Sequence, residues 1–389
     1  MHLAWFRPTQ PEPGDPLDDT AQLIGALRHT HVIDLFDTRT AHDVVWKHAR
    51  SAYDLHVYEL DDTPGHQYIW PYLFHYPGLT LLRSLTLQAS RTAALVRESR
   101  AGDAARECAF DLGRRDAPIP RTARSAPRVW PMLRAPLVAS RACIVPHVTV
   151  ADALRIRYPE ARIAALPSAV SAPTPRRPIH EGCTFGVIAT GDARDRLAVV
   201  HRALQRAREG GVSADAAPID LYVDADARQV LARSDVVLTL QWPTLGAPLV
   251  PAIAGMAAGR AVVVFDTAET ADWPSLDPQT WRERRLFGSA PPICVSLDLR
   301  DEEHSLMVAM RRLAKDIPLR ERLAAAGEAY WREHHAPARV VPLFDRILQE
   351  TSATMPLPRP SGWPAHLEAD GSTRLREILS EMGVVVDIL

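Results

Sequence analysis

Short runs of apolar residues alternate with longer stretches of helical periodicity along most of the chain. In the first half they occupy residues 2–6 (HLAWF), 31–37 (HVIDLFD), 53–60 (YDLHVYEL), 79–84 (LTLLRS), 142–146 (ACIVP) and 162–168 (RIAALPS). In the second half they occupy residues 184–190 (TFGVIAT), 218–224 (PIDLYVD), 235–241 (DVVLTLQ), 261–266 (AVVVFD) and 292–298 (PICVSLD). Apolar runs of strand length between helical segments are typical of βα units and parallel sheets.

The two sets of runs are separated by a stretch without periodicity. Residues 168–182, SAVSAPTPRRPIHEG, are rich in proline and small side chains, as linkers are. The predicted fold class is therefore α/β, with two doubly wound Rossmann-like domains at residues 1–175 and 176–350. We expect ligands in a cleft between them, because such sheets bind ligands at the carboxyl ends of their strands.

After about residue 300 the pattern becomes helical, at residues 302–317, 319–335 and 338–350. The last of these helices is amphipathic and needs a partner surface, so we expect it to cross back onto the first domain. Residues 351–389 are predicted to form a proline-rich tail with a short amphipathic helix.

Composition and charge exclude some partners. The 389 residues are 47% hydrophobic and 24% charged, with a formal net charge of -2, so no basic field attracts nucleic acid. The chain has neither a run of about eighteen apolar residues nor a signal-like N-terminus. We therefore predict a cytoplasmic protein without a transmembrane segment, for which peripheral membrane contact stays open. The four cysteines lie far apart in sequence, which favours reduced, packed thiols over disulfides or a metal site.

One strand-to-helix connection, QWPTLGAP at residues 241–248, has the composition of a phosphate-binding turn. Thr244 and Gly246 would let the backbone approach phosphate oxygens, and Trp242 would fix the turn. A helix beginning near Gly246 would add free N–H groups and a partial positive charge, so we predict that a diphosphate lies there. The alternative is a tight turn in which proline and glycine only end the strand.

Residues 53–91, 140–170 and 234–266 resemble, in this order, parts of the GT-B glycosyltransferases of the family 4 type. The resemblance extends over residues 1–350. It implies that the second domain holds a nucleotide-sugar donor without a bound metal or other cofactor. It also implies that the first domain shapes the site for a glycan, lipid or small-molecule acceptor, and that transfer retains the anomeric configuration.

The donor side departs from the family pattern. Family members carry a glutamate just after the turn glycine and a second one a helical face further on. This chain has Ala247, or Gly246 by a one-residue shift, at the first position and Ala254 at the second. Alanine has no side-chain hydrogen bond to offer a donor hydroxyl.

The cations that clamp the diphosphate in the family are also replaced. The loop after the first strand of the second domain contains Thr190, Gly191 and Asp192, and the nearest cations are Arg194 and Arg196. Both arginines fall in the following helix, so the alternative role for each is a solvated helix face.

The segment that frames the base pocket is shorter than in the family. Either a βα unit has been lost or residues 218–224 do the work of two strands, with Tyr222 as a stacking residue for the base. The predicted donor-binding residues are therefore Thr190, Gly191, Arg194, Tyr222, Trp242, Thr244, Gly246 and Ala247.

The acceptor side is altered too. Arg83 and Ser84 stand where close relatives have a His-Asp pair, and Gln88 and Ala89 replace two histidines that follow it. An arginine can bind an anion there, but it cannot act as a base at neutral pH.

Three residues are candidates for catalysis: His66, Arg83 and His147. His66 matches a family histidine near the acceptor, and His147 is displaced by one residue from a family His-Ser pair. Asp61 and Asp62, before His66, are interpreted as turn and N-cap residues, or as partners of acceptor hydroxyls.

Two main hypotheses follow. The first is an active transferase that moves a sugar from a nucleotide donor to an acceptor. The second is a catalytically silent homologue of the same fold that serves as a binding or scaffolding partner, favoured by the loss of several motif side chains together. Other users of the fold, such as sugar-nucleotide epimerases, are a third and smaller class.

Overall fold

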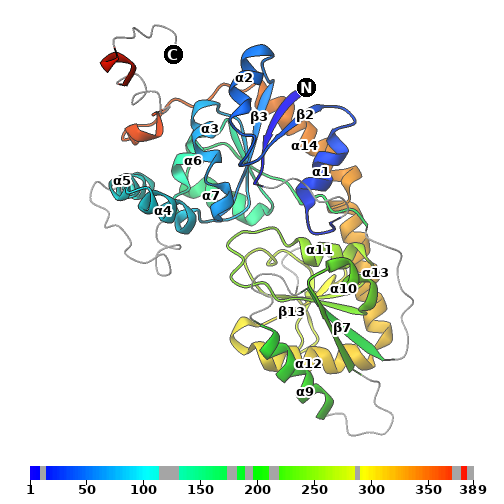
Figure 1. The fold of residues 1–389 in the computed structure, drawn as a ribbon. Helices are drawn as coiled ribbons and strands as arrows, with labels where there is room; N and C mark the ends of the chain where they lie inside the picture. The colour runs from blue at the N-terminus through cyan, green and yellow to red at the C-terminus, as the bar shows by residue number, and fades with distance from the viewer. Residues whose placement is uncertain are drawn as a thin grey trace. The chain divides into compact units, whose positions relative to one another are not determined.

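The structure is a computed structural model that describes residues 1–8, 15–113, 131–172, 182–188, 196–209, 219–284, 290–369 and 378–382. The chain forms two compact units (Figure 1). Unit 1 comprises Met1–Gln10, Thr30–Ala165 and Arg346–Leu389, and unit 2 comprises Pro11–His29 and Leu166–Asp345.

Unit 1 is built on a parallel sheet with the order β2-β1-β3-β4-β5-β6. Its strands are β1 (His2–Phe6), β2 (Val32–Phe36), β3 (Leu55–Leu60), β4 (Leu79–Leu82), β5 (Ala142–Val145) and β6 (Ile163–Ala165). Its helices are α2 (Asp43–Arg50), α3 (Ile69–His75), α4 (Gln88–Arg97), α5 (Ala101–Leu112), α6 (Arg134–Ala139) and α7 (Val148–Arg157), with a short 3-10 turn, η1 (Pro64–His66). All residues of β3 and β4 are buried, including the polar residues His56 and Glu59 of β3.

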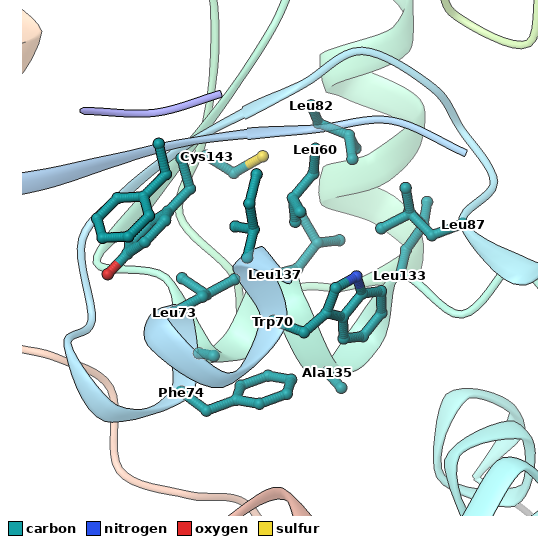
Figure 2. Close-up of a cluster of buried hydrophobic side chains, with 14 of the residues drawn as sticks. Leu60, Trp70, Leu73, Phe74, Leu82, Leu87, Leu133, Ala135, Leu137 and Cys143 are labelled. Carbon is teal, nitrogen blue, oxygen red and sulfur yellow. The ribbon is translucent and has the colours of Figure 1, made fainter. Parts of the chain in front are cut away.

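One face of this sheet packs against α3 and α6 (Figure 2). Trp70 of α3 lies among leucines of the strands and of α6, including Leu60 and Leu137. Burying one such side chain contributes about 1.5–3 kcal/mol, so this cluster is a main source of stability for unit 1.

Unit 2 contains a second sheet, with the order β12-β11-β13-β10-β9-β7-β8. Its strands are β7 (Cys183–Ile188), β8 (Ile219–Asp224), β9 (Val236–Thr239), β10 (Ala261–Phe265), β11 (Ser275–Leu276), β12 (Glu283–Arg284) and β13 (Cys294–Leu297). Its helices are α1 (Asp19–Leu27), α9 (Leu197–Glu209), α10 (Ala227–Arg233), α11 (Val250–Ala257), α12 (Glu302–Lys315) and α13 (Ile317–His334). All pairs are parallel except the short β11–β12 pair, which the apolar pattern did not predict.

Strand β8 is the described strand of the shortened segment. In the part of the chain that the structure describes, a single strand joins α9 to α10, and it pairs along its whole length with β7 at the edge of the sheet. A single strand there agrees with the loss of a βα unit and with one run that does the work of two strands, so both alternatives stay open.

The compact units and the predicted domains divide the chain differently. Helix α1 belongs to unit 2, and so do residues 166–172. The second group is held there because Val170 donates its N–H to the His335 carbonyl and accepts the Trp331 indole N–H, at 2.9 and 2.7 Å. The apolar pattern gives no sign of either connection.

The last long helix, α14 (Pro337–Ser352), begins in unit 2, but the chain belongs to unit 1 from Arg346 onward, as its amphipathic pattern predicts. The predicted tail also packs on unit 1. Trp363 contacts Phe74 and Phe110 edge to face, and Leu367 is buried in the same core. No described helix is both long and apolar enough to cross a bilayer.

A buried histidine makes unit 1 sensitive to acid. His56 of β3 is 6% exposed and lies among aromatic rings, with its centroid 5.1 Å from that of Tyr76. Burial, with smaller contributions from His48 and Arg141, lowers the pKa of His56 from 6.5 to about 3. Between those values the unfolded chain binds a proton that the folded unit does not.

We therefore expect the stability of unit 1 to be highest above pH 6.5 and to fall as the pH drops toward 3. His56 contributes up to about 1.4 kcal/mol per pH unit to this loss. Replacing His56 by phenylalanine should flatten the acid side of the profile, whereas replacing the exposed His42 by asparagine should leave it unchanged. Urea midpoints measured from pH 4 to 8 test this expectation, and parallel profiles for His56→Phe and wild type would contradict it.

Candidate functional site

The connection between β9 and α11, which we name the β9–α11 loop (Leu240–Leu249), turns through a left-handed conformation. Leu245 and Gly246 have positive φ values of 46° and 75°, and Ala247 donates its N–H to the Thr244 carbonyl at 2.8 Å. A left-handed residue cannot continue into an α-helix, so α11 begins at Val250. The prediction of a helix that begins near Gly246 is therefore wrong by four residues.

The Gly246 N–H group has a partner within the protein. It donates to Glu269 Oε1 at 2.8 Å, and Glu269, in the turn after β10, is only 6% exposed. Burial raises the pKa of Glu269, but hydrogen bonds from the Thr244 side chain and the Gly246 N–H outweigh it, so the pKa is lower than usual. A resident carboxylate thus holds the N–H that was predicted to bind a diphosphate, and diphosphate binding at Gly246 stays a prediction.

The remaining donor-site residues fall into three groups. Trp242 is partly buried against the core of unit 2, and Thr244 is buried. Tyr222 of β8 donates its hydroxyl to Asp224 at 3.0 Å, and Arg233 covers its ring 5.0 Å from the centroid. Thr190, Gly191 and Arg194 lie outside the described residues, as does Asp192.

Ala254 stands at the position of the second family glutamate, and its burial explains why a glutamate is absent there. It is fully buried in the core beneath α11, where a carboxylate would be desolvated. Ala247 is half-buried in the β9–α11 loop beside Gly246.

Arg196 reaches the β9–α11 loop. Its Nη2 lies 3.3 Å from the Trp242 carbonyl, its Nη1 lies 2.6 Å from Glu302, and its guanidinium stacks 5.1 Å from the centre of the Phe265 ring. Phe265 is the last residue of β10, so Arg196 lies at the carboxyl ends of the strands. The solvated helix face that was the alternative for Arg196 is therefore wrong.

Unit 1 gathers charged side chains at the carboxyl ends of β1, β3 and β4. Arg7 follows β1 directly, is 5% exposed, and has its Nε 3.8 Å from Glu59 Oε1. Arg83 follows β4 and donates its N–H to the Leu60 carbonyl at 2.8 Å. Sequence reasoning found Arg83 but missed Arg7, although its position immediately after a strand was a usable signal.

His66 lies in the same group of residues and is buried. Its Nδ1 is 2.7 Å from the Thr63 hydroxyl oxygen. Its pKa is lowered to about 4, chiefly by burial; Asp61 raises the pKa, whereas Arg83 and Arg7 add to the lowering. His66 is therefore neutral at pH 7 and offers hydrogen bonds there rather than a charge.

The other acceptor-side residues have structural partners. Asp62 is not the N-cap of the 3-10 turn that follows it, which is Thr63; its side chain instead accepts the N–H of Ser90, in the first turn of α4, at 2.7 Å. His147 follows β5 and uses its carbonyl to close the first turn of α7 through Ala151. Within the described ranges, no group of three His, Cys, Asp or Glu side chains is placed to hold a metal ion.

No protein-family model matches the sequence, and no curated protein matches it either. Many solved structures resemble the chain, among them the following three. S. aureus TarM has a TM-score of 0.50 and 10% identity, covering 78% of this chain and 57% of TarM. The pneumococcal O-GlcNAc transferase GtfA, in complex with UDP and GlcNAc, has a TM-score of 0.50 and 9% identity, covering 82% and 61%.

The third is Anabaena Alr3699/HepE in complex with UDP-glucose, with a TM-score of 0.47 and 11% identity, covering 90% of this chain and all of HepE, 100%. The chain thus spans less than two thirds of the lengths of TarM and GtfA. The likeness to these two proteins concerns the fold: the chain has the two Rossmann-like domains of the GT-B architecture.

Proposed function

We propose that the chain is a glycosyltransferase that moves a sugar from a nucleotide-sugar donor to a glycan, lipid or small-molecule acceptor. The observation that carries the proposal is the position of Arg196 against the β9–α11 loop, at the carboxyl ends of the unit 2 strands. Ligands of doubly wound sheets bind at this edge, and TarM and GtfA share the fold.

The chemistry needs a cation there. A nucleoside diphosphate gains negative charge as the glycosidic bond breaks, and a guanidinium can stabilise that charge bidentately. Glu302 holds Arg196 in place through its ion pair, and the Phe265 ring supports the guanidinium plane. From the residue just before α9, Arg196 would thus supply the positive charge of the cation clamp, for which Thr190 and Gly191 have no side-chain cation.

On the acceptor side, the proposal assigns hydrogen bonding to His66 and anion binding to Arg83 and Arg7. A histidine with a pKa near 4 is a weak base at neutral pH. A weak base at His66 fits transfer with retention better than it fits a mechanism that requires a strong general base. Metal independence and the family 4 type belong to the same proposal and rest on the sequence resemblance.

A silent homologue that serves as a binding partner is the second candidate, and one observation favours it. The Glu269 carboxylate already holds the Gly246 N–H, and neither Ala247 nor Ala254 supplies a carboxylate for donor hydroxyls. Such a protein would keep the fold while binding the donor weakly or not at all.

The test is nucleotide binding by the whole chain. Calorimetric titration with UDP, ADP and GDP, each also as a nucleotide sugar, should find at least one ligand. At a hundredfold excess over Kd that ligand should add about 2.7 kcal/mol of apparent stability. If no nucleotide binds, the result favours the second candidate, a catalytically silent homologue. NMR of the product then reports whether the anomeric configuration is retained.

Arg196→Met should weaken binding of the nucleoside diphosphate about 10- to 100-fold, because a charge-assisted hydrogen bond contributes about 1.5–3 kcal/mol. Arg202→Met is the matched control. Arg202 lies on α9, which begins one residue after Arg196, and it pairs with Glu303 as Arg196 pairs with Glu302, but it is more exposed. Equal affinities for Arg196→Met and wild type would move the donor site elsewhere.

A further inference from the structure

The turn after β10 reaches the β9–α11 loop through one side chain. Glu269 accepts the Gly246 N–H at 2.8 Å in a buried position, and the Thr244 side chain contributes a second hydrogen bond. The carboxylate therefore contacts the loop on both sides of Leu245, where the backbone is left-handed. A left-handed leucine is conformationally costly and persists only when its surroundings hold it in place.

We propose that Glu269 is the positioning residue of the β9–α11 loop and that its carboxylate, not the donor diphosphate, occupies the Gly246 N–H. This inference rests on the proposed function, because it concerns the loop to which the donor binds. It directs the diphosphate to Arg196, which touches the same loop at the Trp242 carbonyl. Two anions at one N–H group would repel each other in a buried place.

The loop itself supports this division of roles. Ala247 donates its N–H to the Thr244 carbonyl, and Pro248 and Pro251 have none to donate. The N–H groups of Gly246 and Ala247, at the centre of the loop, thus already have partners within the protein. An anionic ligand would be attracted most strongly to the side of the loop where Arg196 places its positive charge.

The experiment compares Glu269→Ala with Glu269→Gln in the full chain. The glutamine side chain keeps a carbonyl oxygen that can accept the Gly246 N–H, whereas alanine has no acceptor. Asp272→Ala, an exposed acidic residue of the same turn, is the control. Two quantities are measured: amide hydrogen exchange in peptides that cover residues 242–250, and the Kd of UDP by calorimetry.

We expect Glu269→Ala to speed exchange in these peptides and to weaken UDP binding, each by about tenfold. Glu269→Gln should restore both quantities to near the wild-type values, a rescue that a general loss of stability would not show. Tighter UDP binding by either variant would overturn the proposal, because it would show that the carboxylate blocks the phosphate.

The two readouts separate this inference from the proposed function. Unchanged exchange in Glu269→Ala would refute the positioning role whether or not UDP binds. Rapid exchange in Glu269→Ala with glutamine rescue, in a protein that binds no nucleotide, would support the positioning role and refute donor binding. Faster exchange throughout unit 2 instead of in residues 242–250 would also count against the proposal.

Discussion

Replacing Gly78 by alanine should cost unit 1 about 4 kcal/mol or more, enough to prevent its folding under ordinary conditions. A Cβ atom at Gly78 would lie 2.1 Å from the carbonyl oxygen of His56 and 2.8 Å from its carbonyl carbon. Both atoms are backbone atoms of β3, which is paired with β1 on one side and β4 on the other. The strand therefore cannot move away without breaking the centre of the sheet.

Gly102→Ala is the matched control in the same unit. Gly102 lies in α5, and a Cβ atom there would meet nothing within 4 Å. In a helix this change should stabilise the protein by about 0.5–1 kcal/mol. Urea unfolding followed by circular dichroism measures both variants. Equal midpoints for Gly78→Ala and wild type would mean that the two strands are further apart than the structure describes.

Replacing Arg320 by methionine should destabilise unit 2 by about 4 kcal/mol. Arg320 is 0% exposed and donates to the carbonyls of Leu313 and Ala314, at 2.5 and 2.9 Å, and of Gly182, at 3.1 Å. It thus caps the C-terminal end of α12 and ties it to the residue before β7. Methionine would fill much of the volume but leave three buried acceptors without this donor.

Arg322→Ala tests whether the effect is specific to the buried guanidinium. Arg322 lies on the same helix and is exposed, so its loss should change the free energy of unfolding by less than about 0.5 kcal/mol. Denaturant midpoints for the two variants measure the difference. A cost below about 1 kcal/mol for Arg320→Met would show that water can replace the guanidinium.

The sequence was sufficient for the fold because buried parallel strands read as apolar runs whatever their neighbours are. It predicted the longer strands of both sheets but not β11 and β12, which have two residues each and no period to detect. It could not assign α1 to unit 2, because that choice depends on packing between segments far apart in sequence.

The candidate site was harder to predict for the same reason. Gly246 was identified from its turn chemistry, but its partner Glu269 lies 23 positions further along the chain and is joined to it by a hydrogen bond that no local pattern encodes. The only sign of this contact in the sequence is that Glu269, an acidic residue, lies in the turn directly after β10. Arg196 was also visible in the sequence, but only the structure shows that its side chain turns toward the loop.

The chain passes from one unit to the other after residues 10, 29, 165 and 345, and this path has a consequence for synthesis on the ribosome. Unit 2 has all of its residues once position 345 has emerged. Unit 1 contains the first strand to be made, yet its core still lacks Leu367 at that point. At about 5–20 residues per second, the core of unit 1 is completed only after position 367 has emerged, so the unit that begins first is completed after unit 2.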